Sequence, residues 1–315
     1  MIINRRQLRI KVLQQLYAFD QTEEASLKVF EKNLDHSIEK MFDLYYYYLL
    51  LIIELRLLAE QKIQDGKSKH VPSDKDLNPS LRFINNRLIK SLAENPILAS
   101  RIQERGITWS NEMDIVKGLY KKIREEEFYN EYLESEDKSI EKDSQFMLQL
   151  FKKFIVNDEV IYAHIEDQSI FWIDDIDLVA SMIVKSFKRS KESLGQVEIL
   201  DLFKEEKEER DFYHTLFHNS VMKKEETDGI IRDHTNNWDI ERIALMDILL
   251  MRLAVTEVTS FSSIPIKVTL NEYIELAKQY STSKSNSFVN GILDKSFADL
   301  KKAGKIKKTG RGLME

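Results

Sequence analysis

The stretch IPIKVTLNEYIELAKQYSTSKSNSFVNGILDK, residues 264–295, predicts two helices joined by a polar hinge. Pro265 closes the preceding segment, and Thr269 followed by Glu272 has the spacing of a capping box at a helix start. An apolar stripe expected to face the core then recurs at helical intervals, at Leu270, Ile274, Ala277 and Tyr280. Residues 281–287 are polar with one positive charge, and a second apolar helix is expected to open at Phe288.

The rest of the chain is also helical in character. Its 315 residues include only nine glycines and four prolines, which are few turn-forming residues for this length. Long runs of Leu, Ile, Lys and Glu favour helices, and we find no convincing alternation of apolar and polar residues typical of a strand. The expected fold class is therefore all-α.

The most apolar window covers residues 45–53 and ends at Glu54. It is far shorter than the roughly 20 residues that a membrane-spanning helix requires. We therefore expect a buried helix there and no membrane partner. A charged N-terminus without a signal peptide and the absence of cysteine favour a cytoplasmic protein.

Charge is distributed unevenly along the chain. The net charge of −6 argues against unspecific coating of nucleic acid. Residues 1–19 nevertheless contain four basic side chains and no acidic one, at Arg5, Arg6, Arg9 and Lys11. Residues 300–312 contain six basic side chains and again no acidic one, at Lys301, Lys302, Lys305, Lys307, Lys308 and Arg311.

The first helix is expected over about residues 4–19, with an inward stripe formed by Leu8, Val12, Leu16 and Phe19. Arg5, Arg6 and Arg9 fall largely off this stripe. The planar guanidinium of arginine can bond phosphate through two hydrogen bonds and can stack on bases, so such a helix suits RNA. On composition alone, a solvated helix face is the simpler explanation of these arginines.

Further helical patterns follow the first one. A long second helix is expected over about residues 27–62, and a loop over residues 66–80. Helical patterns resume at residues 81–94, 111–134, 139–164 and 172–188, and the acidic run at residues 205–211 resembles a solvated helix start.

The segments IKVTLNEYIELAKQYST and SFVNGILDK closely resemble the C-terminal signature of the NusB family. The members of this family are small all-helical bacterial factors that bind RNA in transcription antitermination. NRRQLRIKVLQQLYAF resembles the arginine-rich opening of the same family, through Gln14, Leu16 and Tyr17. Residues 238–242 and 248–254 resemble its central helices. The chain departs from the family pattern at Gln7 and Leu8, where the family tends to have an arginine and a small residue.

The resemblance covers about residues 4–19 and 208–298. Residues between them, about 20–207, carry no motif that we can assign and form a long insertion. We therefore expect NusB-like helical bundles in three parts: an N-terminal helical region at 1–207, a C-terminal NusB-like bundle at 208–300, and a basic tail at 301–315.

The resemblance also implies candidate RNA-binding residues at both ends of the chain. They are Arg5, Arg6, Arg9 and Lys11 of the first helix, and Lys284, Ser287 and Phe288, where the polar hinge meets the helix that follows it. An aromatic ring beside a positive charge and a helix N-terminus can stack a base while the backbone N–H groups hold phosphate. The alternative is that Phe288 is a core residue that staples the new helix.

Asp247, Gly291 and Ser287 each have a more specific expected role. The resemblance implies that Asp247 faces the protein partner, although a single carboxylate on a surface is usually only solvated. Gly291 inside a helix costs about 1 kcal/mol relative to alanine, so close helix packing is its expected compensation. Ser287 stands where the family often has a lysine, and Lys284 is expected to substitute for it.

The resemblance implies an RNA-binding antitermination factor. It would bind boxA-type RNA of ribosomal RNA operons together with NusE, the small ribosomal-subunit protein, and promote read-through by RNA polymerase. The alternative is a non-catalytic helical adaptor or a homodimer without RNA affinity. Light scattering beside an RNA titration separates these two hypotheses.

An enzyme is not expected, and neither is a cofactor or a metal. NusB-like domains also precede some ribosomal-RNA cytosine-5 methyltransferases, but those enzymes need a cysteine nucleophile, and this chain has no cysteine. His214 and His218 have a spacing that places two imidazoles on one helical face, but Thr215 stands where an HExxH zinc site needs glutamate. No phosphate-binding glycine loop is present.

Overall fold

The computed structural model describes residues 3–235, 243–282 and 284–313, and within these ranges every regular element is helical. The expected all-α class is confirmed. The chain forms two compact units, one made of residues 3–38 with 202–315 and the other of residues 39–201. Residues 238–242, which resemble a central helix of the NusB family, lie outside the described residues.

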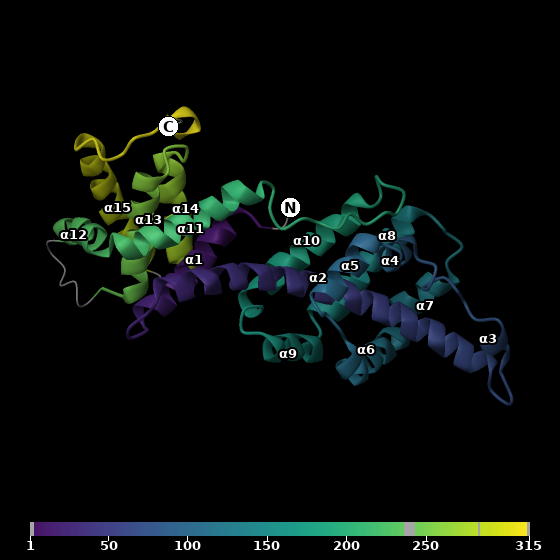
Figure 1. Cartoon of the computed structure of the whole chain (residues 1–315). Helices are drawn as coiled ribbons and strands as arrows, with labels where there is room; N and C mark the ends of the chain where they lie inside the picture. Colours follow the sequence, from purple (N-terminus) through teal and green to yellow (C-terminus); the bar gives the residue numbers. More distant parts are fainter. Residues whose placement is uncertain (1–2, 236–242, 283, 314–315) are drawn as a thin grey trace. The chain divides into compact units, whose positions relative to one another are not determined.

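The unit formed by residues 3–38 and 202–315 is called unit 1 below (Figure 1). Besides the first part of α2, its elements are α1 Arg5–Asp20, α11 Glu206–Met222, α12 Lys224–His234, α13 Leu245–Ser260, α14 Ile266–Tyr280, α15 Ser285–Lys302 and the 3-10 turn η5 Gly310–Leu313. The first helix therefore groups with the C-terminal helices, although most of the chain separates them in sequence. The expected division of the chain into residues 1–207, 208–300 and 301–315 stays a prediction.

The unit formed by residues 39–201 is called unit 2 and corresponds to most of the insertion. Helix α2 Leu27–Lys67 runs from unit 1 into it. Its other elements are α3 Asp74–Leu77, α4 Arg87–Ala93, α5 Pro96–Glu104, η1 Ser110–Glu112, α6 Met113–Glu125, α7 Glu127–Glu134, α8 Ile140–Leu150, the π-helical turn η2 Phe151–Val156, α9 Glu159–Gln168, η3 Ile173–Asp175 and α10 Ile176–Arg189.

Unit 2 has an aromatic core around the most apolar part of α2. Seven of the nine side chains at residues 45–53 are buried, so the expected buried helix is confirmed. The Tyr47 ring stacks on Trp109 with centroids 4.2 Å apart, and its hydroxyl lies 2.7 Å from Nε2 of the buried His164. Among the described residues, none of the helices is both long and apolar enough to cross a membrane.

Helix α13 is the central helix of unit 1. Eleven of the twelve residues from Asp247 to Val258 are buried, because its sequence LMDILLMRLAVTEVTS is apolar nearly all round. It packs against α11, α12, α14, α15 and α1. A helix enclosed in this way can carry charged side chains only if partners compensate them, and Arg252 and Glu257 both meet that condition. Arg252 pairs with Asp228 and Asp20 at 2.8 and 3.2 Å.

The helix α14 begins without the expected capping box. Its N-cap is Pro265, which provides no side-chain hydrogen bond, and the helix already includes Thr269 and Glu272. Both side chains are used in tertiary contacts instead: Thr269 is buried against Glu257, and Glu272 pairs with Arg6. The capping-box prediction was therefore wrong, because these two residues have partners on other helices.

The inward stripe of α14 is displaced from the expected one. Its buried side chains are Thr269, Tyr273, Leu276 and Ala277, whereas Leu270, Ile274 and Tyr280 are only half-buried. The next helix, α15, begins at Ser285 and not at Phe288. The hinge is therefore shorter than the sequence indicates, because its serines form part of the first helical turn.

The basic tail returns to the bundle after α15 ends at Lys302. Lys308 Nζ donates to the carbonyl oxygens of Val258 and Phe261 at 2.9 and 2.8 Å, near the end of α13. Burial lowers the pKa of Lys308, although nearby Glu257 opposes that shift. The lysine thus caps orphan carbonyl groups at the C-terminus of α13.

Candidate nucleic-acid interface

Helix α1 starts with an asparagine cap that fixes where its arginines lie. Asn4 Oδ1 accepts hydrogen bonds from the backbone N–H groups of Arg6 and Gln7 at 2.9 and 3.2 Å. Leu8, Val12 and Leu16 are buried as expected, and Phe19 is half-buried against the rings of Phe30 and Phe217. The predicted inward stripe of the first helix is therefore confirmed in its main positions.

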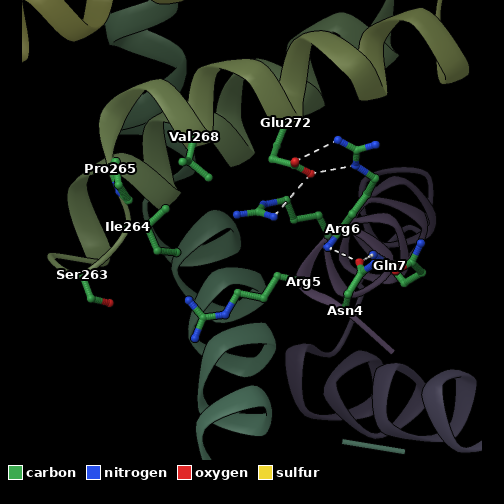
Figure 2. A pocket seen from close by; sticks show the side chains of 10 residues that line it. Asn4, Arg5, Arg6, Gln7, Ser263, Ile264, Pro265, Val268 and Glu272 are labelled. Atoms are coloured by element: carbon green, nitrogen blue, oxygen red, sulfur yellow. Dashed lines mark hydrogen bonds and ion pairs between the residues drawn. The ribbon is translucent and has the colours of Figure 1, made fainter. Parts of the chain in front are cut away.

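Arg6 lies at the surface and is bound by a glutamate of α14. Its Nε and Nη2 donate to Glu272 Oε2 and Oε1 at 2.9 and 2.8 Å, a two-bond pairing drawn in Figure 2. The Arg6 side chain is 45% exposed and that of Glu272 is 19% exposed. The hydrogen bonds from Arg6 hold the pKa of Glu272 below its ordinary value, so the carboxylate is charged at neutral pH.

Arg9 is buried, contrary to the expectation that it lies off the inward stripe. Its side chain is 3% exposed, and its Nε and Nη2 donate to Glu257 at 2.7 and 2.8 Å. Thr269 and Tyr273 also donate to Glu257, at 2.8 and 3.1 Å. Burial opposes the charge on Arg9, but the hydrogen bonds and charge of Glu257 outweigh it and raise the pKa of Arg9.

Arg5 faces α11 instead of α14. It pairs with Glu208 and, at 3.5 Å, with Glu209, and its guanidinium lies 5.1 Å from the centre of the Phe212 ring. In Figure 2, Arg5 extends away from Glu272. Lys11, the fourth basic residue of the helix, is buried at 2% exposure. Only Arg5 and Arg6 of the four candidates therefore have side chains that reach solvent.

An open pocket of about 650 Å³ lies beside these arginines. The start of α1 lines one side of it, and the segment from Ser263 to Val268 lines the other (Figure 2). Pro265 and the 43% exposed Val268 give this side an apolar character. The pocket thus combines guanidinium groups and the Glu272 carboxylate with an aliphatic surface, and none of its lining residues is aromatic.

The start of α15 forms a second candidate surface. Lys284 and Ser287 are exposed, Phe288 is half-buried, and no acidic side chain occurs in the first turn. With Gly291, these residues have helical spacing that places them on one face of α15. Gly291 is exposed, and a Cβ added to it would meet no other atom within 4 Å, so the expected close packing at Gly291 was wrong.

Asp247 is buried and does not form an exposed carboxylate. It is 5% exposed in the first turn of α13, and its Oδ2 accepts a hydrogen bond of 2.8 Å from the Ser285 hydroxyl. Ser285 in turn lies 2.9 Å from Ser281 and 2.8 Å from Thr282. Asp247 therefore holds the hinge and the first turn of α15, while its role in partner binding stays a prediction.

The two candidate surfaces both belong to unit 1. Among the described residues, Arg5 forms ion pairs with α11 and Arg6 with α14, and neither forms one with Lys284. Helix α14 connects them, since Arg6 pairs with Glu272 in the middle of this helix and α15 follows its end. From Glu272 to Tyr280 the helix rises by roughly 12 Å.

The acidic partners of the arginines were not among the predicted site residues. Glu257 carried a usable signal, because a carboxylate within the apolar run of α13 requires a buried cation. Glu208, Glu209 and Glu272 carried none, because each occurs in a segment that reads as an ordinary solvated helix face. The two histidines with one-face helical spacing pair separately with α2, His214 with Asp35 and His218 with Glu31, at 3.0 and 2.9 Å.

Comparison with known proteins identifies the class of this helical bundle. The model described as NusB family matches residues 175–297, which include α10 of unit 2 and most of the C-terminal helices of unit 1. Among solved structures, no significant match is found.

Three curated relatives are each called Transcription antitermination protein NusB. The protein of Salinibacter ruber is 48% identical over 105 residues, which are 33% of this chain and 66% of that protein. The protein of Chloroherpeton thalassium is 41% identical over 106 residues, 34% of this chain and 50% of that protein. The protein of Natranaerobius thermophilus is 35% identical over 108 residues, 33% of this chain and 78% of that protein.

The fold and the matched segment define an all-helical protein whose arginine-bearing first helix packs on a C-terminal bundle. The chain belongs to the NusB family. It spans 66% and 50% of the length of the first two relatives, and unit 2 lies largely outside the matched residues.

Proposed function

We propose that this protein is an RNA-binding transcription antitermination factor. In this proposal it binds boxA-type RNA of ribosomal RNA operons together with NusE, the small ribosomal-subunit protein, and promotes read-through by RNA polymerase. The observation that carries the proposal is the similarity of its C-terminal helices to proteins called transcription antitermination protein NusB.

The position of α1 supports the RNA-binding part of the proposal. Helix α1 packs against α11 and α13, which belong to the matched segment, and brings Arg5 and Arg6 to the pocket beside α14. Arg5, which is half-buried, and Arg6, which is exposed, are the two members of the arginine-rich opening whose side chains reach solvent. Guanidinium groups at such a site bind phosphate with two hydrogen bonds and strong charge assistance.

The start of α15 supplies the second contact in this proposal. Phe288 would stack an unpaired base, Lys284 and Ser287 would bind the adjoining phosphate, and the exposed Gly291 would leave room beside the ring. Arg9 and Lys11 would contribute through the packing of α1 and not through contacts with RNA, because both are buried. Asp247 would act indirectly, by holding Ser285 and the hinge.

A binding assay with and without NusE tests the proposal. Fluorescence anisotropy of a labelled boxA-type RNA is expected to report modest affinity for this protein alone and higher affinity with NusE, because few phosphates are contacted and the net charge is −6. Replacing both Arg5 and Arg6 by Gln should weaken binding. The matched control replaces the exposed Lys28 and Arg232 by Gln, which changes the net charge equally.

Two results would overturn the proposal. One is binding that is insensitive to salt and to the Arg5 and Arg6 replacements. The other is a stable homodimer in light scattering that has no RNA affinity with or without NusE, which would favour the adaptor hypothesis. Transcription through a terminator downstream of boxA, with and without the protein, measures the read-through step.

A further inference from the structure

The arginine-rich start of α1 is not a positively charged surface. Three guanidinium groups and four carboxylates meet there: Arg5, Arg6, Arg9, Glu208, Glu209, Glu257 and Glu272. Negative groups therefore outnumber positive ones by one. A face of this composition does not attract phosphate as a free arginine cluster would.

The carboxylates occupy the hydrogen-bond donors that a phosphate would use. Glu272 accepts from both Nε and Nη2 of Arg6, which is the two-bond geometry in which guanidinium also binds phosphate. In the same way, Arg5 donates from Nη2 to Glu208 and from Nε to Glu209. An RNA phosphate that binds either arginine in this mode has to displace a carboxylate.

We infer that Glu272 and Glu208 hold the exposed arginines of α1 in closed ion pairs and thereby limit the affinity of this protein for RNA. The inference rests on the proposed function, since it assigns a regulating contact to the same surface. In the free protein, Arg6 is bound by Glu272 and Arg5 by Glu208. RNA binds by exchange, in which a phosphate oxygen takes the place of the carboxylate oxygen on each guanidinium.

The degree of burial separates the exchangeable pairs from the permanent one. The Arg6 and Glu208 side chains are 45% and 58% exposed, so solvent and salt already weaken their ion pairs. The Arg9 and Glu257 side chains are 3% and 0% exposed and share further hydrogen bonds with α14. Only the outer pairs can therefore open without disturbing the packing of unit 1.

The test compares the RNA affinity of the wild type with that of Glu272→Gln, Glu208→Gln and the double variant. Labelled boxA-type RNA and fluorescence anisotropy are used between about 50 and 200 mM salt. Each single variant should bind more tightly than the wild type, and the double variant by roughly two- to ten-fold. The slope of log K against log salt should steepen by about 0.7 for each released arginine, the value for a single-strand phosphate contact.

A matched control separates this effect from net charge. Glu23→Gln removes one negative charge beyond the far end of α1, where Glu23 is exposed. From Arg6 to the end of α1 the helix rises by roughly 21 Å, which exceeds the screening length of about 8–10 Å. Glu23→Gln should therefore leave both affinity and salt slope unchanged. Circular dichroism on heating checks that every variant is folded.

A second pair of variants tests whether the gain passes through the arginine. In an Arg6→Gln background, Glu272→Gln should no longer raise RNA affinity, because there is no guanidinium to release. Equal affinity and equal slope for wild type and the Glu208/Glu272 double variant would overturn the inference, as would an equal gain from Glu23→Gln.

The outcomes also distinguish this inference from the proposed function. In one outcome, RNA binding depends on Arg5 and Arg6 but is the same in the wild type and in the glutamate variants. That outcome supports the proposed function and contradicts the inference that the ion pairs limit affinity. Binding by the double variant alone, with none by the wild type, supports both. Absence of binding in every variant, with NusE present, rejects both.

Discussion

Arg9 and Glu257 lie 248 positions apart in the sequence and form a buried ion pair through two hydrogen bonds of 2.7 and 2.8 Å. The pair joins α1 to α13 at the centre of unit 1. Thr269 and Tyr273 of α14 complete the coordination of the carboxylate. One glutamate side chain, that of Glu257, therefore connects three helices of unit 1, α1, α13 and α14.

Replacement of one partner of this pair should destabilise the protein strongly. Arg9→Ala leaves Glu257 charged and buried, so the free energy of unfolding should fall by about 3–5 kcal/mol in a urea titration. The comparison is Arg6→Ala, which breaks an exposed pair and should change stability by about 1 kcal/mol or less. Equal effects of the two substitutions would contradict the assignment of Arg9 to the core.

The hydrogen bond from Ser285 to Asp247 should hold the start of α15. Asp247→Ala leaves the buried Ser285 hydroxyl with fewer partners and should lower stability by about 1–3 kcal/mol. Amide hydrogen exchange should speed up in the first turn of α15 and remain unchanged in unit 2. Unaltered exchange at residues 285–288 in a destabilised variant would show that Asp247 acts elsewhere.

Substitution of glycine by alanine should have opposite effects on stability at two positions of unit 1. Gly291→Ala adds a methyl group into open space within a helix, so stability should rise by about 1 kcal/mol. Gly312→Ala places a Cβ in steric conflict with the carbonyl oxygen of Ser262 and should destabilise the C-terminal segment. Thermal unfolding of both variants measures the two changes in stability. If both variants were stabilised or both destabilised, the surroundings described for one of the two glycines would be wrong.

Acidification should destabilise unit 2 through His164. Burial lowers the pKa of this imidazole below its ordinary value of 6.5, against the opposing charges of Glu112 and Asp167. The unfolded chain therefore binds a proton at a higher pH than the folded one, so stability is greatest above about pH 6.5 and falls as the pH decreases towards the folded pKa. His164→Gln should flatten this part of the stability profile measured by urea unfolding at successive pH values.

The ring of Phe288 should matter for RNA more than for stability. Phe288→Leu keeps an apolar side chain on the half-buried position but removes the stacking face, and RNA binding should weaken by about 1–3 kcal/mol. Phe288→Tyr keeps the ring and should bind RNA nearly as the wild type does. Equal losses in both variants would indicate that the ring packs in the bundle and does not stack a base.

Short-range features of the chain were predictable because their causes lie within a few residues. The buried stripe of Leu8, Val12 and Leu16 and the all-helical class follow from periodicity and the scarcity of turn residues. The sequence of residues 264–295 was sufficient to indicate the NusB family. Helix α14 followed as an element, although its start and its buried face were displaced.

The amino-acid sequence by itself determined that the chain is helical, which family it joins and where most helices lie. Only the tertiary structure decided that α1 packs with residues 202–315, that Arg9 is buried, and that Glu272 binds Arg6 instead of capping α14. The physical reason is range: helix formation depends on neighbours along the chain, whereas the partner of a charged side chain is set by whichever distant helix is brought beside it.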